Sequence, residues 1–386
     1  MLRSRAAMAG AILLVGMMSL VGFFGAAHAS MSTSTYLDAS SIGGGFEYTS
    51  GGNALVIGPD GHLYAVVGTT IPTTSSQIIR ADAGSQRPIS ATSVVTDAAT
   101  GVVNDWLGSV AFDGAGNLYT IGTDGHVWEQ PVGSPGTLVD YADFSSLSTS
   151  SGLVVANGYI YVSDNDFMGD IWRVPTGATT SLPLAAQDWA TGLGTSGVNS
   201  MAMDGTDLIA AANDSSLFRL DTSQGSIAGP SPWMTSGQLP PQLRSQVATD
   251  SVGNVYFASS HALYMIPVGT TSYELLADNI DPSGDGLGSL VVSGGSVFVV
   301  AGGPQGQAPQ VVLELTGIVP TTTSTTSPST TSTPPTTGSP STTAPGTTTT
   351  GPGGLAITGA PLLLSAALGL LSIATGVVLR KTRRHA

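Results

Sequence analysis

The chain has 386 residues, of which only 9% are charged and none is cysteine. The lack of cysteine excludes disulfides, thiolate catalysis and cysteine-based metal sites. Six of the eleven basic residues lie in the two ends, so residues 30–358 hold five basic and 25 acidic residues, a net charge of −20. A domain this acidic is a poor partner for nucleic acid, because phosphate binding requires Lys and Arg.

The first 29 residues have the pattern of a secretory signal peptide. Arg3 and Arg5 precede an uncharged apolar run at positions 11–25. Ala27 and Ala29 then place small residues before Ser30, which predicts cleavage between Ala29 and Ser30. An uncleaved N-terminal anchor is the alternative, but the run is shorter than the ~20 residues that a membrane span needs.

The C-terminal end predicts a transmembrane helix. Residues 361–379 carry no charge, and 19 residues at ~1.5 Å rise make about 28 Å, the thickness of a hydrocarbon core. Four basic residues follow at positions 380–384. A basic cluster after the span keeps the C-terminus cytoplasmic and places the rest of the chain outside.

A short motif precedes this helix. Leu355, Ala356, Ile357, Thr358 and Gly359 read LAITG. Together with the helix and the basic tail, residues 355–386 resemble a cell-wall sorting signal of the LPxTG kind, in the LAxTG form used by sortases of high-GC Gram-positive bacteria. The resemblance implies that a sortase cysteine attacks the Thr358 carbonyl, releases Gly359 onward and passes the chain to a peptidoglycan amine. A plain single-span membrane protein is the alternative, and it has the same topology.

Residues 318–354 are almost wholly Thr, Ser, Pro and Gly. Such a segment cannot bury enough apolar surface to fold, so it is predicted to be disordered. Proline biases it towards extended polyproline II, which would reach at most on the order of 100 Å. We therefore expect a stalk, either O-glycosylated or a plain flexible spacer.

The segment between residues 53 and 317 repeats one pattern six times: an apolar strand, a turn with Gly or Asp, a second strand with aromatic or β-branched residues, a loop and a third strand. The first strands begin at Asn53, Ser109, Ser151, Ser200, Gln246 and Ser289, and the third strands at Gln77, His126, Asp170, Leu217, Ala262 and Gln310. The period of roughly 42 to 55 residues suits a blade of four strands. The sequence therefore predicts an all-β fold for residues 30–317, a six-bladed β-propeller.

The strand count predicts how the propeller closes. After each of the first five third strands there is room for a fourth strand, but the sixth is followed almost at once by the stalk. The unassigned segment Thr35–Ile42 is therefore expected to be the outer strand of blade six. Pairing the two ends of the domain would close the ring and cover an exposed strand edge.

Blade three carries a family resemblance. Residues 153–174 (LVVANGYIYVSDNDFMGDIWRV) are similar to the NHL pattern of a strand, a Gly turn, Tyr-Val-x-Asp, a polar loop and Ile-x-Arg. The repeat as a whole resembles the NHL and gluconolactonase-type propellers. The resemblance implies the fold, whereas function depends on the site.

The predicted central ring is neutral. The repeats place Ala54, Ser109, Ser151, Ser200, Gln246 and Ser289 where the innermost strands enter the channel. A gluconolactonase-like enzyme would need carboxylates and amides there to hold a divalent metal, and only Asn104, Asp105 and Asn199 lie just upstream. The three histidines of the domain could hold a zinc ion, but they are expected to flank turns at the surface.

Two acidic loops are candidate calcium sites. The first loop contains Asp164, Asp166 and Asp170, and the second contains Asp281, Ser283 and Asp285. The second resembles the front half of a calcium-binding loop, but the closing Glu is missing. Neither loop alone supplies the six to eight oxygens that calcium requires, so the alternative is Asp-rich turns without an ion.

Tryptophans accompany acids in the loops before the innermost strands. These pairs are Asp105 with Trp106 and Asp188 with Trp189, and Trp233 follows a proline. Exposed on one face, they would form a platform for a glycan or a peptide. The alternative is that the tryptophans pack between blades.

These observations favour a non-catalytic recognition or adhesion module for carbohydrate or protein, anchored in the wall or membrane of a Gram-positive, actinobacterial cell. The expected partners are a sortase, peptidoglycan and an extracellular glycan or protein, with the membrane holding the C-terminal helix before sorting. Calcium is the one cofactor that the loops suggest. An extracellular metal-dependent hydrolase or lyase of the lactonase type and a structural wall protein are the alternatives.

Overall fold

A computed structural model describes residues 31–38, 45–46, 53–68, 76–84, 86–101, 107–147, 150–166, 169–194, 197–240, 243–281, 286–302 and 310–317. The chain divides into two units, Met1–Thr325 and Thr326–Ala386, and every described residue belongs to the first. The predicted signal peptide, stalk and sorting signal lie outside the described residues. Within the described part, no helix is both long enough and apolar enough to cross a membrane.

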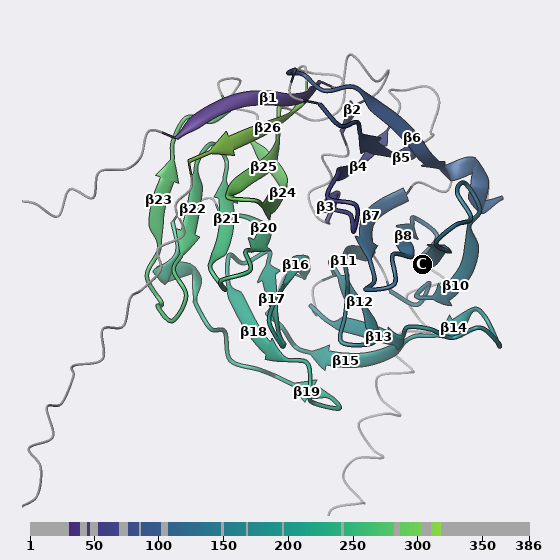
Figure 1. Ribbon diagram of the computed structural model, residues 1–386. Helices are drawn as coiled ribbons and strands as arrows, with labels where there is room; N and C mark the ends of the chain where they lie inside the picture. Colours follow the sequence, from purple (N-terminus) through teal and green to yellow (C-terminus); the bar gives the residue numbers. More distant parts are fainter. Residues whose placement is uncertain are drawn as a thin grey trace, which may run out of the picture. The chain divides into compact units, whose positions relative to one another are not determined.

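Six antiparallel sheets surround a central axis as the blades of a propeller, which confirms the predicted fold (Figure 1). Blade one contains β2 (Gly45–Phe46), β3 (Leu55–Ile57), β4 (Leu63–Gly68), β5 (Ser76–Ala81) and β6 (Ala91–Thr96). Blade two contains β7 (Leu107–Phe112), β8 (Leu118–Gly122), β9 (His126–Gln130) and β10 (Val139–Asp143). Blade three contains β11 (Ser150–Ala156), β12 (Tyr159–Asp164), β13 (Ile171–Pro175) and β15 (Gln187–Thr191).

The remaining blades follow the same order from the axis outward. Blade four contains β16 (Val198–Asp204), β17 (Asp207–Ala212) and β18 (Leu217–Asp221). Blade five contains β20 (Leu243–Thr249), β21 (Val255–Ser259), β22 (Leu263–Ile266) and β23 (Glu274–Ala277). Blade six contains β24 (Leu287–Ser293), β25 (Ser296–Ala301), β26 (Val311–Thr316) and β1 (Ser32–Asp38). Short 3-10 helices occupy Asp97–Thr100 and Ser236–Gln238.

The N-terminal strand closes the ring, as the strand count predicts. Strand β1 pairs with β26 in antiparallel register, with Ser32 opposite Thr316 and Asp38 opposite Val311. The strand begins at Ser32, three residues before the predicted start, and residues 39–44 lie outside the described part. Leu37 is fully buried in a core cluster shared by blades six and one, so closure also buries apolar surface.

Blade four departs from the expected four strands. Its described sheet has three strands, and Met234 covers the outer edge through a single bridge to Leu217. The chain between them supplies β19 (Ile227–Ala228), which pairs in parallel with the outer strand β15 of blade three. In the same way, β14 (Leu184–Ala185), which precedes β15, pairs in parallel with β10 of blade two. These crossovers cover strand edges that would otherwise be open to association.

A third crossover lies at the closure of the ring. The Ile89 amide of blade one donates to the Tyr36 carbonyl of β1 at 2.7 Å. Arg87 Nε and Nη2 both donate to Glu314 Oε2, at 3.0 and 2.7 Å, and the guanidinium lies 4.5 Å from the centre of the Tyr36 ring. Arg87 therefore ties blade one to both outer strands of blade six.

We expect Arg87→Met to lower the free energy of unfolding by about 1–2 kcal/mol, because Glu314 loses its partner and is itself mostly buried. Chemical denaturation of the purified protein measures this. Arg80→Met is the matched control, since the Arg80–Asp60 pair is more exposed and should contribute less. If Arg80→Met lost as much stability as Arg87→Met or more, Arg87 would not be the residue that stabilises the contact between blades one and six.

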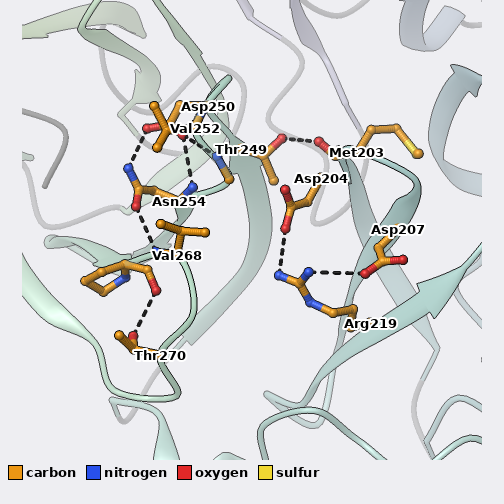
Figure 2. A network of polar contacts seen from close by, with 12 residues as sticks. Met203, Asp204, Asp207, Arg219, Thr249, Asp250, Val252, Asn254, Val268 and Thr270 are labelled. Atoms are coloured by element: carbon orange, nitrogen blue, oxygen red, sulfur yellow. Dashed lines mark hydrogen bonds and ion pairs between the residues drawn. The ribbon is translucent and has the colours of Figure 1, made fainter. Parts of the chain in front are cut away.

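In two blades, a hydrogen-bond network of an Asp, an Asn and a Tyr, called a hook below, holds the turn between the first and second strands. In blade five, Asp250 Oδ1 accepts the amides of residues 252–254, each at 2.9 Å. Its Oδ2 accepts Asn254 Nδ2 at 2.8 Å, and Asn254 Oδ1 accepts the Val268 amide (Figure 2). The same Oδ2 accepts the Tyr256 hydroxyl at 2.9 Å. Blade two repeats the hook with Asp113, Asn117, Tyr119 and Val132.

The propeller has two faces that the strand directions define. The mouth face is the one at which the innermost strands begin, and the turn face carries the turns between first and second strands. Strand β25 starts at the turn face with Ser296, and β26 runs back with Leu315 opposite Val297. Ser32 lies opposite Thr316. Both ends of the domain are therefore on the turn face, beside blade six.

Candidate ligand-binding site at the mouth face

The six predicted ring residues are buried next to the channel. They are Ala54, Ser109, Ser151, Ser200, Gln246 and Ser289, each less than a tenth exposed. The serine hydroxyls join neighbouring blades. Ser109 donates to the Ser151 carbonyl at 2.5 Å, and Ser151 donates to the Asn199 carbonyl at 3.0 Å. Ser289 accepts the Leu55 amide, and Ser200 accepts the Val247 amide. The ring serines therefore hold neighbouring blades together by hydrogen bonds.

Asn53 spans the channel. Its Nδ2 donates to the Met201 carbonyl at 2.6 Å, and its Oδ1 accepts the Met201 amide at 3.3 Å. Blade one lies opposite blade four in a six-bladed ring, so this side chain joins strands across the axis. Gly152 makes room for it, because a Cβ there would lie 3.3 Å from Asn53 Oδ1. The sequence pattern gave no sign of this contact.

A chain of amide side chains lies at the mouth between blades three and four. Asn199 Nδ2 donates to Asn213 Oδ1, and Asn213 Nδ2 donates to Asn165 Oδ1. Asn199 is 6% exposed, whereas Asn165 is half-buried and Asn213 is exposed. Asn199 Oδ1 is buried, and no donor among the described residues reaches it. A buried acceptor left without a donor costs about 1–3 kcal/mol, so this position is suited to a ligand or a water.

Glycines bring the loops of this mouth together. Gly169 and Gly197 have φ of 58° and 83°, which side-chain-bearing residues rarely adopt. A Cβ on Gly197 would lie 2.5 Å from the Asn165 carbonyl carbon, and one on Gly169 would lie 2.7 Å from the Leu193 oxygen. The Leu193 amide donates to the Gly169 carbonyl at 3.1 Å. This contact fixes the segment carrying Asn199 against the acidic loop of blade three.

The acidic loop of blade three borders the mouth. Asp164 is buried and accepts the Asp166 amide at 3.1 Å, while Asp170 accepts the Gly192 amide at 3.1 Å. Burial raises the pKa of Asp170, and the charges of Asp188, Asp164 and Asp166 raise it further against the opposing Gly192 hydrogen bond. These carboxylates therefore act on one another electrostatically, but nothing in the described part of the chain groups three acids or histidines as a metal would require.

The second acidic loop closes on itself. Asp281 is 5% exposed, and its Oδ2 accepts the Gly286 amide at 2.6 Å, so this carboxylate joins the two ends of the loop. The predicted partners Ser283 and Asp285 lie outside the described residues. The described contact is that of a turn residue.

Trp189 does not belong to an exposed platform. Asp188 and Trp189 lie in the outer strand β15, and Trp189 is 1% exposed. Its ring packs edge-on against Tyr161 at 4.9 Å, and its Nε1 donates to the Gln224 carbonyl of the blade four crossover at 2.9 Å. Trp189 is therefore packed inside the domain, which was the alternative to an exposed platform, because the crossover from blade four covers it.

The other described tryptophan of the predicted platform, Trp233, packs in a different core cluster from Trp189. Trp233 is half-buried on blade four, with the Arg219 guanidinium 4.9 Å from its ring centre. Arg219 is held by Asp204 at 2.7 Å and Asp207 at 3.2 Å (Figure 2). Asp105 and Trp106 lie outside the described residues.

We expect Trp189→Phe to lower the free energy of unfolding by about 1–2 kcal/mol, because the Gln224 carbonyl loses the 2.9 Å bond from Trp189 and keeps only the longer one from Arg173, while the aromatic packing is kept. Urea denaturation of the purified protein is the measurement. Trp128→Phe is the matched control, because Trp128 is also buried but its Nε1 has no acceptor among the described residues. Unchanged stability of Trp189→Phe would mean that the Nε1 contact does not hold the crossover.

The histidines are engaged separately. His126 Nδ1 contacts Asp140 Oδ1 at 2.9 Å, His62 Nδ1 contacts the Ala81 carbonyl at 2.9 Å, and His261 Nδ1 contacts the Ser260 hydroxyl at 2.8 Å. Burial acts to lower the pKa of His126, but Asp140 outweighs it and raises the pKa above its ordinary value. The three histidines thus contact different groups, in blades two, one and five respectively.

No family model matches the sequence, and no curated protein is similar to it. Solved structures of other six-bladed propellers are similar in fold. A gluconolactonase of Xanthomonas campestris has a TM-score of 0.52 at 12% identity, covering 75% of this chain and 90% of that one. A luciferin-regenerating enzyme has a TM-score of 0.52 at 12% identity, covering 75% and 96%. A structural-genomics protein of Bacteroides thetaiotaomicron has a TM-score of 0.50 at 13% identity, covering 74% and 76%.

At such identities these likenesses concern the fold alone, and they support a six-bladed propeller similar in fold to a gluconolactonase. The resemblance stated from the sequence implies a divalent metal in the channel. The described channel residues do not fit one: the ring is neutral and bonded between blades, and Asn53 crosses the axis. The carboxylates of the described mouth are not grouped around one point.

Proposed function

We propose that this chain is a recognition module displayed outside the cell, and that its propeller binds a neutral carbohydrate at the mouth between blades three and four. The observation that carries the proposal is the buried Asn199 Oδ1, which no donor within the described ranges reaches. A sugar hydroxyl that donates to this atom would remove the cost of the unmet acceptor.

The chemistry of the mouth supports a polyol. Amide groups both donate and accept, and the neighbouring carboxylates accept, so together they match the mixed donors and acceptors of sugar hydroxyls. The net charge of residues 30–358 is −20, which disfavours anionic polymers. Each Arg with a described side chain is already engaged: Arg80, Arg87 and Arg219 in ion pairs, and Arg173 over two aromatic rings.

The position of the two ends of the propeller domain supports display of the mouth face outside the cell. The described domain ends at Gly317 on the turn face, and the proposed stalk continues from there. A head attached by its turn face presents the mouth face away from the attachment point. The proposed signal peptide cleavage before Ser30, the stalk and sortase transfer at Thr358 together would place that face outside the wall.

The purified full-length protein should bind neutral glycans on an array, and Asn199→Ala should weaken that binding at least about tenfold, because it removes the buried acceptor. Gln224→Ala is the matched control, since it removes an exposed amide from the connection that follows β18. Both variants should keep the wild-type circular dichroism. Equal binding by Asn199→Ala and wild type would refute the site, and no binding to any neutral glycan would refute the ligand class.

The same atom favours a second candidate function. An amide oxygen can also be one ligand of a metal, so an extracellular metal-dependent hydrolase or lyase of the lactonase type is the alternative, although the described mouth supplies no group of three acids or histidines to complete such a site. Elemental analysis of the purified protein distinguishes the two. A stoichiometric divalent ion that Asn199→Ala abolishes would favour the enzyme, and no bound metal together with glycan binding would favour the recognition module.

A further inference from the structure

His126 lies at the mouth face of blade two, where β9 begins and β10 ends. Its Nδ1 is 2.9 Å from Asp140 Oδ1, and its Nε2 is 3.9 Å from Asp143 Oδ1. Side chains alternate along a regular strand, so residues 140 and 143 would point to opposite faces of the sheet. A bulge between Asp140 and Ala142 adds one residue and brings both carboxylates to the face of His126.

The ring can attract both carboxylates only when it is protonated. Neutral imidazole carries one N–H, whereas imidazolium carries one on each nitrogen. The 3.9 Å contact between His126 Nε2 and Asp143 is too long for a hydrogen bond, so it depends on charge. When the ring is neutral and Nδ1 donates to Asp140, Nε2 presents a lone pair to the Asp143 carboxylate. The contact with Asp143 is therefore favourable only in the protonated state.

The described charges around the ring favour the protonated state. Burial acts to lower the pKa of His126, but the hydrogen bond and charge of Asp140, with the charges of Asp124 and Asp143, outweigh it and raise the pKa. Hydrogen bonds from the Ser145 hydroxyl and amide, and then the charge of His126, lower the pKa of Asp143. The neighbouring strands β8 and β14, and the outer strand β6 of blade one, carry no charged side chain.

The Asp143 end of β10 is also the point where the crossover from blade three joins blade two (Figure 1). Asp143 lies opposite Ala185 of β14, and its carbonyl accepts the Ala186 amide at 3.3 Å. The crossover strand has only two residues, so few backbone hydrogen bonds hold it. A contact that fixes Asp143 therefore also fixes the strand to which the crossover is bonded.

We infer that protonation of His126 stabilises the pairing of β14 with blade two, so that this edge of the propeller is held more firmly in mild acid than in alkaline solution. Because the pKa of His126 is raised, the folded protein binds the proton more tightly than the unfolded chain does. The added stability is present in full below the unfolded pKa of about 6.5, and it is lost as the pH rises through the folded pKa. The cover of this strand edge therefore depends on pH.

Thermal unfolding of the purified full-length protein at about pH 5 and at about pH 9, on either side of the ordinary histidine pKa, tests this inference. His126→Gln should lower the Tm by about 2–4 °C at the acid pH and by less than about 1 °C at the alkaline pH, because glutamine cannot carry the charge. Asp143→Asn keeps an acceptor for the Ser145 amide but removes the charge that faces Nε2, so it should show the same pattern.

His261→Gln is the matched control, because the described contact of the His261 ring is with the neutral Ser260 hydroxyl. It should show no loss of Tm that is confined to acid. Equal losses of Tm at the two pH values for His126→Gln would overturn the inference, since they would mean that the ring acts by packing and not by its charge.

Hydrogen exchange locates the effect. After correction for the intrinsic exchange rates, residues 184–186 of the wild-type protein should be protected at least about threefold more at the acid pH than at the alkaline pH. His126→Gln should abolish this difference. Protection of residues 184–186 that is the same at both pH values in the wild-type protein would overturn the inference.

Discussion

Asp250→Ala is expected to destabilise the propeller by about 3 kcal/mol, with a fall in Tm of about 5–10 °C. The substitution removes the acceptor of three backbone amides and two side chains. The turn amides can bond to water, but the Tyr256 hydroxyl belongs to a residue that is 1% exposed, and it would lose its partner. Calorimetry of the purified protein measures the change.

The pH dependence of the stability provides a second test of the Asp250 hook. Burial acts to raise the pKa of Asp250, but the hydrogen bonds from Asn254, Tyr256 and the Val252 amide outweigh it and hold the pKa below its ordinary value. A carboxyl whose folded pKa is lowered adds stability above its unfolded pKa of about 3.9, and this stability is lost as pH falls through the folded pKa. Asp250→Ala should therefore cost less in acid than at pH 7.

At pH 7, Asp113→Ala in the matching hook of blade two should also lower the Tm, because it removes the acceptor of Asn117 and Tyr119, whereas Ser251→Ala in the blade five turn should change the Tm little. Asp250→Asn keeps one acceptor oxygen and should fall between wild type and Asp250→Ala. A loss below about 1 kcal/mol for both Asp250→Ala and Asp113→Ala would show that the hooks do not hold their turns.

Asn53→Ala should lower the free energy of unfolding by about 2–3 kcal/mol, because both hydrogen bonds across the channel to the Met201 backbone are lost. Asn53→Asp keeps an acceptor for the Met201 amide but faces the Met201 carbonyl with a carboxylate, so it should be at least as damaging. Equilibrium denaturation measures both variants.

Asn117→Ala is not a suitable control, since Asn117 belongs to the blade two hook. Gln224→Ala removes an exposed amide and should leave stability unchanged. Wild-type stability of Asn53→Ala would mean that water replaces the amide in the channel without cost, and that the contact between blades one and four does not contribute to the fold.

The repeat pattern predicted the fold because each blade buries its strands in the same way. The spacing of the six segments and the missing fourth strand of blade six were enough to predict closure by the N-terminal strand. The exception is blade four, where Met234 replaces a strand by one bridge, because the chain has already joined β15 of blade three. A crossover of two residues has no periodicity by which it could be recognised.

The site was less accessible to sequence reasoning. Asn199 stood next to a predicted ring residue, but its bond to Asn213 joins the first strand of blade four to the loop after the second, and its approach to Asn165 depends on Gly197. For Trp189 the sequence left both an exposed platform and packing between blades open, because local sequence does not show that the Gln224 segment returns to cover it. Contacts made by chain that returns from another blade require the folded register.

The proposed ligand lies in the mouth between blades three and four, on the face opposite the stalk. Hydrogen exchange of the full-length protein, measured with and without the neutral glycan that binds best on the array, tests this directly. We expect slower exchange at residues 164–170, 197–201 and 212–216, and unchanged exchange at the turns that contain Asp113 and Asp250. Protection of those turns, with the mouth segments unchanged, would show that the glycan binds the turn face and not the mouth.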